Sequence, residues 1–380
     1  MDLVAGRAWA DERRPIRHLD PVLLIVTGAL SVIGLLSIYS ATHASRVSLG
    51  DDPMYYVKKQ VAALVLGVLL LLVIATFDYR FFKVYAGFIY AAAVMLLVLV
   101  RVPGIGSSAN GAQRWFQFAG FQLTPSELAK IALIVMLAAM LSELKTPEPT
   151  IGDLIRVCVV AGVPMILVLV QPDIGTTIVL AAITVGVLVV AGTRPRHLLA
   201  LALTAVVLIA LAFQLHVIQD YQIARLTGFL DPQHSSDTTR YNREQSEIAV
   251  GSGGIFGRGY LAGTQTNLNY VPEQHTDFIF TVVGEEFGFI GAIFVLALYA
   301  ILIWRAIRIS FLSKDPFGTY VAAGVASMFA IQMFVNVGMV IGIMPITGIP
   351  LPFVSYGGTA MLANFVGVGL LLNVHMRRFK

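Results

Sequence analysis

One stretch of the sequence places acidic side chains at the start of an apolar run. It reads NYVPEQHTDFIFTVVGEEFGFIGA and contains Asp277, Glu285 and Glu286. Ionisable side chains near membrane depth are costly, and they usually face a water-filled cavity or a charged partner. Partial burial would favour proton uptake by Asp277, as a general base requires, whereas a helix dipole would favour its charged form. Asp277 is therefore the first candidate for proton transfer.

Helical geometry separates these three carboxylates. At about 100° and 1.5 Å per residue, Glu285 lies roughly 80° around the helix from Asp277 and about 12 Å deeper, whereas Glu286 lies almost opposite. We therefore predict that Glu285 shares a cavity with Asp277 and that Glu286 is a structural partner elsewhere in the bundle. A purely structural alternative is that Thr276 caps the helix that Asp277 opens.

A second candidate pair lies in the stretch QLTPSELAK. Thr124, Pro125 and Glu127 match the N-cap residue, first-turn proline and glutamate of a capping box. Lys130 follows Glu127 at a spacing that allows an ion pair on a helix. Two interpretations stay open: a helix cap, or a charged pair that points into the same cavity as Asp277.

Further candidates lie in short polar segments between apolar runs. Asp173 follows Pro172 and suits a helix start as well as a functional site. Trp115 suits an interfacial anchor, or it forms with Arg114 a pair that stacks on a sugar and binds phosphate. Other arginines are predicted on the outer face of the membrane, where they are either ordinary solvated residues or ligands for an anionic lipid headgroup. They are Arg101, Arg225, Arg240, Arg243 and Arg258.

Several other kinds of site find no support. GSGGIFGRG lacks the Lys-Ser/Thr of a P-loop, and VSYGG is not the G-x-S-x-G of a nucleophile elbow. The histidines are scattered without zinc spacing, and the single cysteine, Cys158, excludes a disulfide framework. Nucleotide binding and hydrolysis by a triad or by zinc are therefore not expected.

The composition indicates that lipid is the main solvent of the chain. Of 380 residues, 57% are hydrophobic and 13% are charged, whereas a soluble domain has roughly a quarter charged residues. We predict an all-α polytopic membrane protein with about ten spans of about 20 apolar residues each. The predicted spans are Pro21–Ala41, Val57–Phe77, Phe81–Val100, Pro125–Leu144, Leu154–Val170, Ile174–Ala191, Pro195–Gln219, Thr276–Arg305, Phe317–Ile343 and Pro350–Val374.

Charge distribution predicts the orientation of these spans. An even number of spans places both termini on one side, and most Lys and Arg residues fall in connections on that side, which indicates cytoplasmic termini. Residues 1–20 are then a cytoplasmic tail, 21–375 the transmembrane domain and 376–380 a basic cytoplasmic tail. Within the transmembrane domain, 220–275 form one long extracytoplasmic loop. The prolines and glycines of IPLPFVSYGG predict a broken or re-entrant entry to the last span.

The motifs resemble those of the SEDS family (shape, elongation, division and sporulation), closer to its elongation branch than to its division branch. They are NGAQRWF, QLTPSELAK, QPDIGT, QSEIAVGSGGIFGRG, PEQHTDFIFTVVGEEFGFIG and GIMPITGIPLPFVSYGG, and they are spread over nearly the whole chain. The resemblance implies a ten-helix peptidoglycan glycosyltransferase in the bacterial cytoplasmic membrane. Its implied substrate is lipid II, the lipid-linked disaccharide-peptide precursor, at the outer face. Its implied partners are a class B penicillin-binding protein transpeptidase and other membrane proteins of the elongation complex, without nucleic acid.

The resemblance also implies roles for individual residues. Asp277 matches the essential catalytic carboxylate of the family, and Trp115 matches a functionally important tryptophan. The remaining motif positions are expected to bind substrate; they are Arg101, Arg114, Glu127, Lys130, Asp173 and Glu285. Asp277 would act as general base on the GlcNAc 4-hydroxyl while undecaprenyl pyrophosphate leaves, with basic side chains and with or without a divalent cation to stabilise that leaving group.

Two other classes of function fit parts of the pattern. A flippase that carries lipid II outward would also use membrane-embedded charge and broken helices. It should need polar groups on both leaflets, whereas the motifs cluster on the predicted outer face. A scaffold for the transpeptidase would not need the carboxylates around Asp277. The enzyme is therefore the favoured interpretation.

Overall fold

The computed structural model describes residues 19–104, 106–109, 112–118, 121–144, 146, 148–214 and 237–378. The N-terminal tail before residue 19, Arg225 with the first part of the predicted 220–275 loop, the end of the predicted seventh span and Lys380 lie outside these residues. The longer helices are α2 (Pro21–Ser48), α3 (Tyr55–Thr76), α5 (Ala86–Leu99), α6 (Pro125–Leu141), α7 (Ile151–Val170), α8 (Ile174–Val190), α9 (Pro195–Gln214), α11 (Asp237–Ser252), α13 (Ile279–Leu312), α14 (Pro316–Val340) and α15 (Gly358–Met376).

Short elements complete the described part of the chain. Two are helices of one or two turns, α4 (Tyr79–Val84) and α12 (Thr264–Asn267). Three strands form one antiparallel sheet in the order β1 (Ser107–Ala109), β2 (Ala112–Phe118) and β3 (Phe121–Leu123). The sheet occupies a connection that the sequence predicted as loop, because alternating polar and aromatic residues over so few positions give a weak strand signal.

The apolar helices confirm the predicted polytopic membrane architecture. Within the described residues, six helices are long and apolar enough to span a membrane, and three shorter apolar helices accompany them. Large apolar side chains point outward along these helices, including Ile155 (60% exposed) and Phe289 (63% exposed). A surface of this kind is stable in lipid and costly in water.

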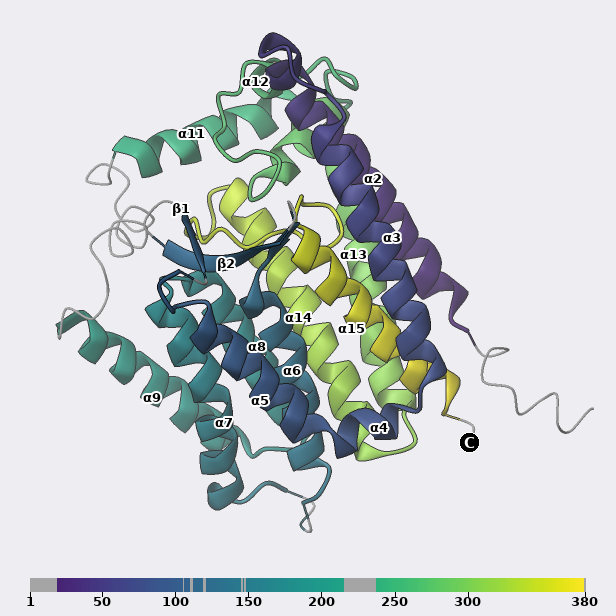
Figure 1. Ribbon diagram of the computed structural model, residues 1–380, viewed down its shortest axis with the longest axis vertical. Coiled ribbons are helices and arrows are strands. Elements are labelled where there is room, and N and C mark those ends of the chain that lie inside the picture. The colour runs from purple at the N-terminus through teal and green to yellow at the C-terminus, as the bar shows by residue number, and fades with distance from the viewer. Residues whose placement is uncertain are drawn as a thin grey trace, which may run out of the picture.

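α14 forms the centre of the bundle and packs against α6, α8, α13 and α15 (Figure 1). α3 packs against α15, and α2 packs along α13. α11, α12 and the sheet gather at one end of the bundle, whereas α2 begins and α15 ends at the opposite end (Figure 1). α9 leans away from the other helices (Figure 1).

Several helix boundaries differ from the predicted spans, and three of these differences change where a span begins or whether it is continuous. The predicted span Phe81–Val100 is divided into α4 and α5 at Tyr85, whose backbone is not helical. The span predicted from Thr276 begins as a helix only at Ile279, with Phe278 as its N-cap residue, so the predicted Thr276 cap is wrong. The Thr276 hydroxyl instead donates to the Glu273 carbonyl. The last span begins at Gly358, after a non-helical entry of the kind that its prolines and glycines predicted.

α13 is interrupted at Gly288, and the glycine-rich stretch GSGGIFGRG supplies hydrogen-bond partners for the backbone groups that the interruption frees. Gly288 has a φ of +64°, which interrupts the helical hydrogen bonds. The Glu285 and Glu286 carbonyls accept from the amides of Arg258 and Gly259, each at 3.0 Å. The Phe289 and Ile290 amides donate to the carbonyls of Gly254 and Ile255. Such backbone pairing satisfies polar groups that lipid cannot.

The segment between α14 and α15, residues 341–357, is a second stretch of irregular backbone, and it is buried at residues 351–355. Side chains from other helices satisfy its backbone groups. Gln60 of α3 binds the Ser355 carbonyl at 3.1 Å and the Gly357 amide at 3.2 Å. The Tyr299 hydroxyl of α13 donates to the Pro352 carbonyl. These contacts make the segment a defined structure instead of a loose loop.

α7 stays continuous but contains a proline, Pro164. Proline lacks an N–H, so the Val160 carbonyl one turn earlier loses its helical partner. The hydroxyl of Tyr90 on α5 donates to that carbonyl at 2.7 Å. This hydrogen bond connects α7 to α5 one turn before Pro164.

The close packing of the stretch GSGGIFGRG against the α13 break predicts the effect of Gly257→Ala. Gly257 has a φ of +81°, and an added Cβ would overlap the Glu286 carbonyl oxygen. We expect the substitution to lower the melting temperature in detergent, with a loss of at least about 1–3 kcal/mol. Gly251→Ala is the matched control, because Gly251 lies in α11 with open space around its Cβ position. Equal melting temperatures for the two variants would contradict the conclusion that this stretch stabilises the α13 break.

Candidate active site

Asp277 lies directly before α13, in a tightly held turn. Its amide donates to the Glu273 carbonyl at 3.1 Å, and its carbonyl accepts from Nδ2 of Asn336 on α14 at 2.7 Å. Asn336 also donates to the Ile349 carbonyl at 2.7 Å, so one buried amide joins the Asp277 turn to the 341–357 segment. The Asp277 side chain is half-buried and faces Gly348, where a Cβ would lie 3.1 Å from Oδ2.

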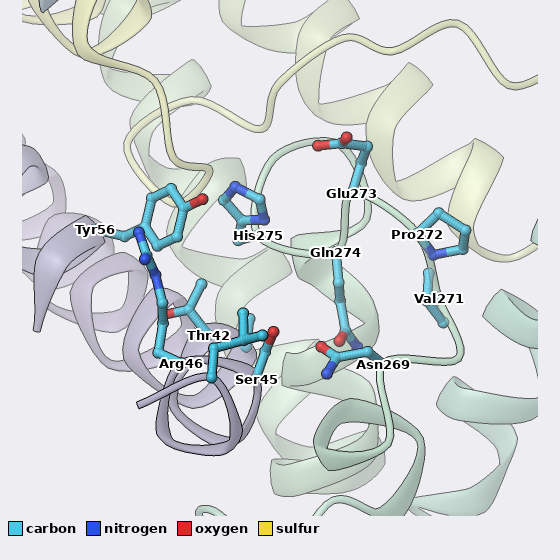
Figure 2. Close-up of a pocket in the computed structure, with 12 residues that line it drawn as sticks. Thr42, Ser45, Arg46, Tyr56, Asn269, Val271, Pro272, Glu273, Gln274 and His275 are labelled. Carbon is cyan, nitrogen blue, oxygen red and sulfur yellow. The ribbon is translucent and has the colours of Figure 1, made fainter. Parts of the chain in front are cut away.

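A cavity of about 410 Å³ is lined by the residues that precede this turn, up to His275, whereas Asp277 itself is not one of its lining residues. Its walls are the end of α2, the start of α3 and the loop 269–275 (Figure 2). Arg46, Tyr56 and His275 lie close together on one side of it, and Glu273 and Asn269 lie across from them (Figure 2). The cavity therefore combines a guanidinium, a carboxylate, amides and aromatic rings, which suits a ligand with both charged and sugar-like groups.

Arg46 and His275 are each held in place by aromatic rings. The Arg46 guanidinium lies 4.3 Å from the centre of the Tyr55 ring and 4.9 Å from that of Tyr56. The His275 imidazole packs between Tyr56 and Tyr356, with ring centres 4.7 Å and 5.6 Å away. Burial lowers the pKa of His275, and the positive charge of Arg46 acts in the same direction, whereas the nearby Glu273 carboxylate raises it.

Arg101 and Arg114 meet at the end of α7. Arg101 donates to the Val170 carbonyl, and Arg114 donates to the carbonyls of Gln171, at 2.7 Å, and Pro172. These last carbonyls of a helix carry partial negative charge, which attracts cations. Both arginines are therefore anchored at the QPD segment.

Asp173 continues this arrangement as the N-cap residue of α8. Its carboxylate accepts from the Thr176 amide at 3.0 Å and from the Thr176 hydroxyl at 2.8 Å. The start of α8 packs on the 341–357 segment, since a Cβ on Gly175 would lie 2.9 Å from the Thr347 carbonyl oxygen. The start of α8 and Asp277 thus lie against neighbouring residues of the same irregular segment, Thr347 and Gly348.

Trp115 lies on β2, directly after Arg114. The register with β1 shifts here, because Ser107 pairs with Trp115 and Ser108 with Gln113, so Arg114 lies at an irregularity of the strand. The predicted pairing of Trp115 with Arg114 on one ligand stays a prediction. The Trp115 carbonyl accepts from the Ser107 hydroxyl at 3.0 Å, and its side chain is half-buried. A role for Trp115 in substrate binding stays a prediction.

Glu127 and Lys130 form a buried ion pair on α6. Lys130 Nζ lies 2.7 Å from Glu127 Oε2, with side chains 1% and 8% exposed. The predicted capping box is wrong, because the Thr124 side chain makes no cap hydrogen bond. Thr359 of α15 binds this region instead, by accepting from the Thr124 amide at 3.1 Å and donating to the Gln122 carbonyl at 2.8 Å. The pair therefore lies inside the bundle, not at its surface.

Glu285 does not line the cavity, contrary to the prediction from helical geometry. Its side chain is fully buried, and Oε2 accepts from the Thr266 amide at 2.9 Å and the Thr266 hydroxyl at 2.7 Å. Oε1 accepts from the Gln265 amide at 2.8 Å. The prediction failed because it assumed one continuous helix from Asp277, whereas the helix starts at Ile279 and the loop folds back over it.

Glu286 bridges α2 and the loop, as predicted for a structural partner elsewhere in the bundle. Its Oε1 accepts from the Ser40 hydroxyl on α2 and from the Leu261 amide at 3.1 Å. Its side chain is 1% exposed. Both glutamates therefore fasten the loop 253–267 to the membrane helices.

Several residues around the site were not singled out from the sequence. They are Arg46, Tyr56, Glu273, His275 and Asn336. The only sequence signals were an amide inside an apolar span for Asn336 and closeness to Asp277 for Glu273 and His275. Among the described residues, no three His, Cys, Asp or Glu side chains form a group that could hold a metal ion.

Known proteins resemble this chain over nearly its whole length. The family model FtsW/RodA/SpoVE, described as cell cycle protein, matches residues 21–380. A probable peptidoglycan glycosyltransferase FtsW of Geobacter metallireducens is 37% identical, with 96% of each chain covered. The peptidoglycan glycosyltransferase MrdB of Escherichia coli is 36% identical, with 95% of this chain and 94% of that protein covered.

Solved structures match as well, each at 30% identity and over 95% of this chain. One is a chain from a study of how a peptidoglycan synthase complex coordinates polymerization and crosslinking, with a TM-score of 0.80 and 99% of that chain covered. Another is the rod shape determining protein RodA of Thermus thermophilus, with a TM-score of 0.70 and 98% of that chain covered.

The bonds to Glu285 predict what Glu285→Gln does to the loop. An amide NH₂ cannot accept from the Gln265 and Thr266 amides as a carboxylate does, and charge-assisted hydrogen bonds contribute about 1.5–3 kcal/mol each. We expect these two amides to exchange hydrogen roughly ten to a hundred times faster in the variant. Glu247→Gln, which disturbs only an exposed pair with Arg243, is the control. Unchanged exchange at Gln265 and Thr266 would contradict the anchoring role.

Proposed function

The chain belongs to the FtsW/RodA/SpoVE family, and from this premise we propose that it polymerises lipid II into glycan strands with Asp277 as the general base. Relatives named peptidoglycan glycosyltransferases support the reaction class. The observation that carries the role of Asp277 is its position. It is a half-exposed carboxylate whose backbone is fixed on both sides, two residues after His275, which lines a cavity that combines charged and aromatic groups.

In the proposed reaction, Asp277 takes the proton of the GlcNAc 4-hydroxyl on the acceptor lipid II. The oxygen attacks the anomeric carbon of the terminal MurNAc on the growing chain. The bond from that carbon to undecaprenyl pyrophosphate breaks, and the configuration inverts from α to β. One base suffices for this single displacement, because pyrophosphate is a good leaving group and does not need the second carboxylate of a glycosidase.

The arginines at the end of α7 are suited to the leaving pyrophosphate. A guanidinium has five N–H donors, and the carbonyl bonds of Arg114 use only part of them. Arg101 and Arg114 are therefore anchored yet able to bind phosphate oxygens. Lys130 is buried in an ion pair with Glu127. We therefore propose that Lys130 holds α6 in place and affects substrate binding only indirectly. We assign the cavity at Arg46 and Glu273 to the disaccharide-peptide of one lipid II molecule.

The proposed setting is the outer face of the bacterial cytoplasmic membrane, with both termini in the cytoplasm. The structural relative from a peptidoglycan synthase complex supports a transpeptidase as partner, which we take to be a class B penicillin-binding protein. Relatives of similar identity carry the division name FtsW and the name MrdB. We propose the elongation role because the motifs NLNYVPEQHTDFIF and MPITGIPLPFVSYGG resemble that branch more closely.

Asp277→Asn tests the general base. The variant keeps the size and backbone bonds of the residue but cannot take a proton, so we expect polymerisation of lipid II to fall by about 10²–10⁴-fold. The measurement is glycan polymer formed by the purified protein with its transpeptidase partner. Asp78→Asn serves as the control, because Asp78 is half-exposed and pairs with Arg377 at the opposite end of the bundle, where α15 ends (Figure 1).

The outcomes separate the enzyme from the flippase. Equal polymer from wild type and Asp277→Asn, with unchanged melting temperatures, would remove Asp277 from the catalytic role. No polymer from the wild type, together with transfer of lipid II across liposome membranes, would favour a flippase.

Asn336→Ala tests whether the Asp277 turn must be held in place. We expect kcat to fall by about a hundredfold, because small displacements of a catalytic group are costly, while KM changes little. Asn373→Ala is a matched control: Asn373 also donates to two backbone carbonyls, those of Ile74 and Phe77, at the opposite end of the bundle. Similar losses of kcat in both variants would mean that general destabilisation, not the position of Asp277, limits the rate.

A further inference from the structure

An apolar groove of about 620 Å³ lies between α7 and the first half of α9, and none of its lining residues belongs to the Asp277 turn. Its floor includes Ile155, Cys158, Gly162 and Ile166 of α7, and Leu201 of α9 closes the other side. The groove exists because α9 leans away from the bundle and leaves this face of α7 uncovered (Figure 1). Its volume falls within the range of roughly 300–1,000 Å³ that ligand pockets occupy.

Basic groups gather at the end of the groove where both helices begin. Arg194 pairs with Glu148 at 2.5 Å, and Arg156 lies 3.9 Å from Asp153, so these two charges are balanced. Arg196 is exposed and has no ion-pair partner in the part of the chain that the structure describes. The N-termini of α7 and α9 also face this end, and each contributes partial positive charge.

His197 and Gly162 give the groove its polar mouth and its depth. His197 lines the groove one residue after Arg196, and its buried Nδ1 has no hydrogen-bond partner among the described residues. Gly162 lies in the wall of α7 with open space where a Cβ would project. A long apolar chain can therefore lie along α7 while a headgroup reaches Arg196 and His197.

We propose that this groove is a binding site for an anionic phospholipid of the inner leaflet. The acyl chain lies over Gly162, and the phosphate binds Arg196 and His197. Charge complementarity favours an anionic headgroup over a zwitterionic one, because the exposed Arg196 has no ion-pair partner among the described residues. Basic pockets between helices on the cytoplasmic side are known to bind such headgroups. The site is independent of Asp277 and of the proposed polymerase reaction.

Lipid retention by the full-length protein tests the proposal. The protein in detergent is given equal amounts of dioleoyl phosphatidylglycerol and dioleoyl phosphatidylethanolamine, and bound lipid is counted by native mass spectrometry. We expect the wild type to prefer phosphatidylglycerol by about five-fold, the effect of one basic side chain at an anionic surface. Arg196→Gln should abolish the preference. Gly162→Leu should reduce binding of both lipids roughly ten-fold or more, because its side chain occupies the acyl path.

Matched controls separate the groove from the rest of the lipid-facing surface. Gly28→Leu places the same side chain in open space on α2, and Arg308→Gln removes an exposed charge at the end of α13; neither should change retention. Equal binding of both lipids by wild type and Arg196→Gln would overturn the proposal in favour of ordinary surrounding lipid. Displacement of phosphatidylglycerol by undecaprenyl phosphate, but not the reverse, would overturn it in favour of a substrate tail.

Discussion

Backbone groups that leave a helix inside a membrane must find partners within the protein, because hydrocarbon offers none. This constraint explains the construction around the candidate site. At Gly288 the freed carbonyls of Glu285 and Glu286 bind amides of the glycine-rich loop. The irregular segment 341–357 is satisfied by Gln60, Tyr299 and Asn336. The 341–357 segment thereby holds non-helical backbone directly beside the Asp277 turn.

Most of the buried charged side chains hold loops and helices together and are not assigned a part in the proposed reaction. Glu285 and Glu286 are fully or almost fully buried, and both bind loop amides. The Glu127–Lys130 pair lies inside the bundle, close in sequence to the Thr124–Thr359 contact between α6 and α15. A buried carboxylate with several amide donors is an effective anchor, since its removal leaves those donors unsatisfied. Asp277 differs from these residues because its side chain remains half-exposed.

Much of the fold was predictable, because spanning helices have a strong signal in length and hydropathy. The cap role of Asp173 and the irregular entry to α15 also followed from local residue types. The side on which Glu285 lies could not be predicted, because the prediction assumed a continuous helix from Asp277. The helix instead begins at Ile279 and is interrupted at Gly288. The small sheet and the anchoring of Arg101 and Arg114 at the end of α7 were missed as well. These features depend on contacts between residues 57 to 69 positions apart or on strands too short for a periodic signal.

By itself, the sequence determined a polytopic helical membrane protein, its approximate spans, and Asp277 as the leading candidate for proton transfer. Those conclusions rest on local composition and motif wording, which do not require knowledge of distant contacts. Only the tertiary structure decided which charged residues face a cavity and which are buried anchors. It brought Arg46 of α2 and Tyr56 of α3 to the loop before Asp277 and set Asn336 of α14 beneath that turn. The physical reason is that burial and hydrogen bonding depend on how helices pack and on how loops return over them, and neither is encoded at a fixed sequence spacing.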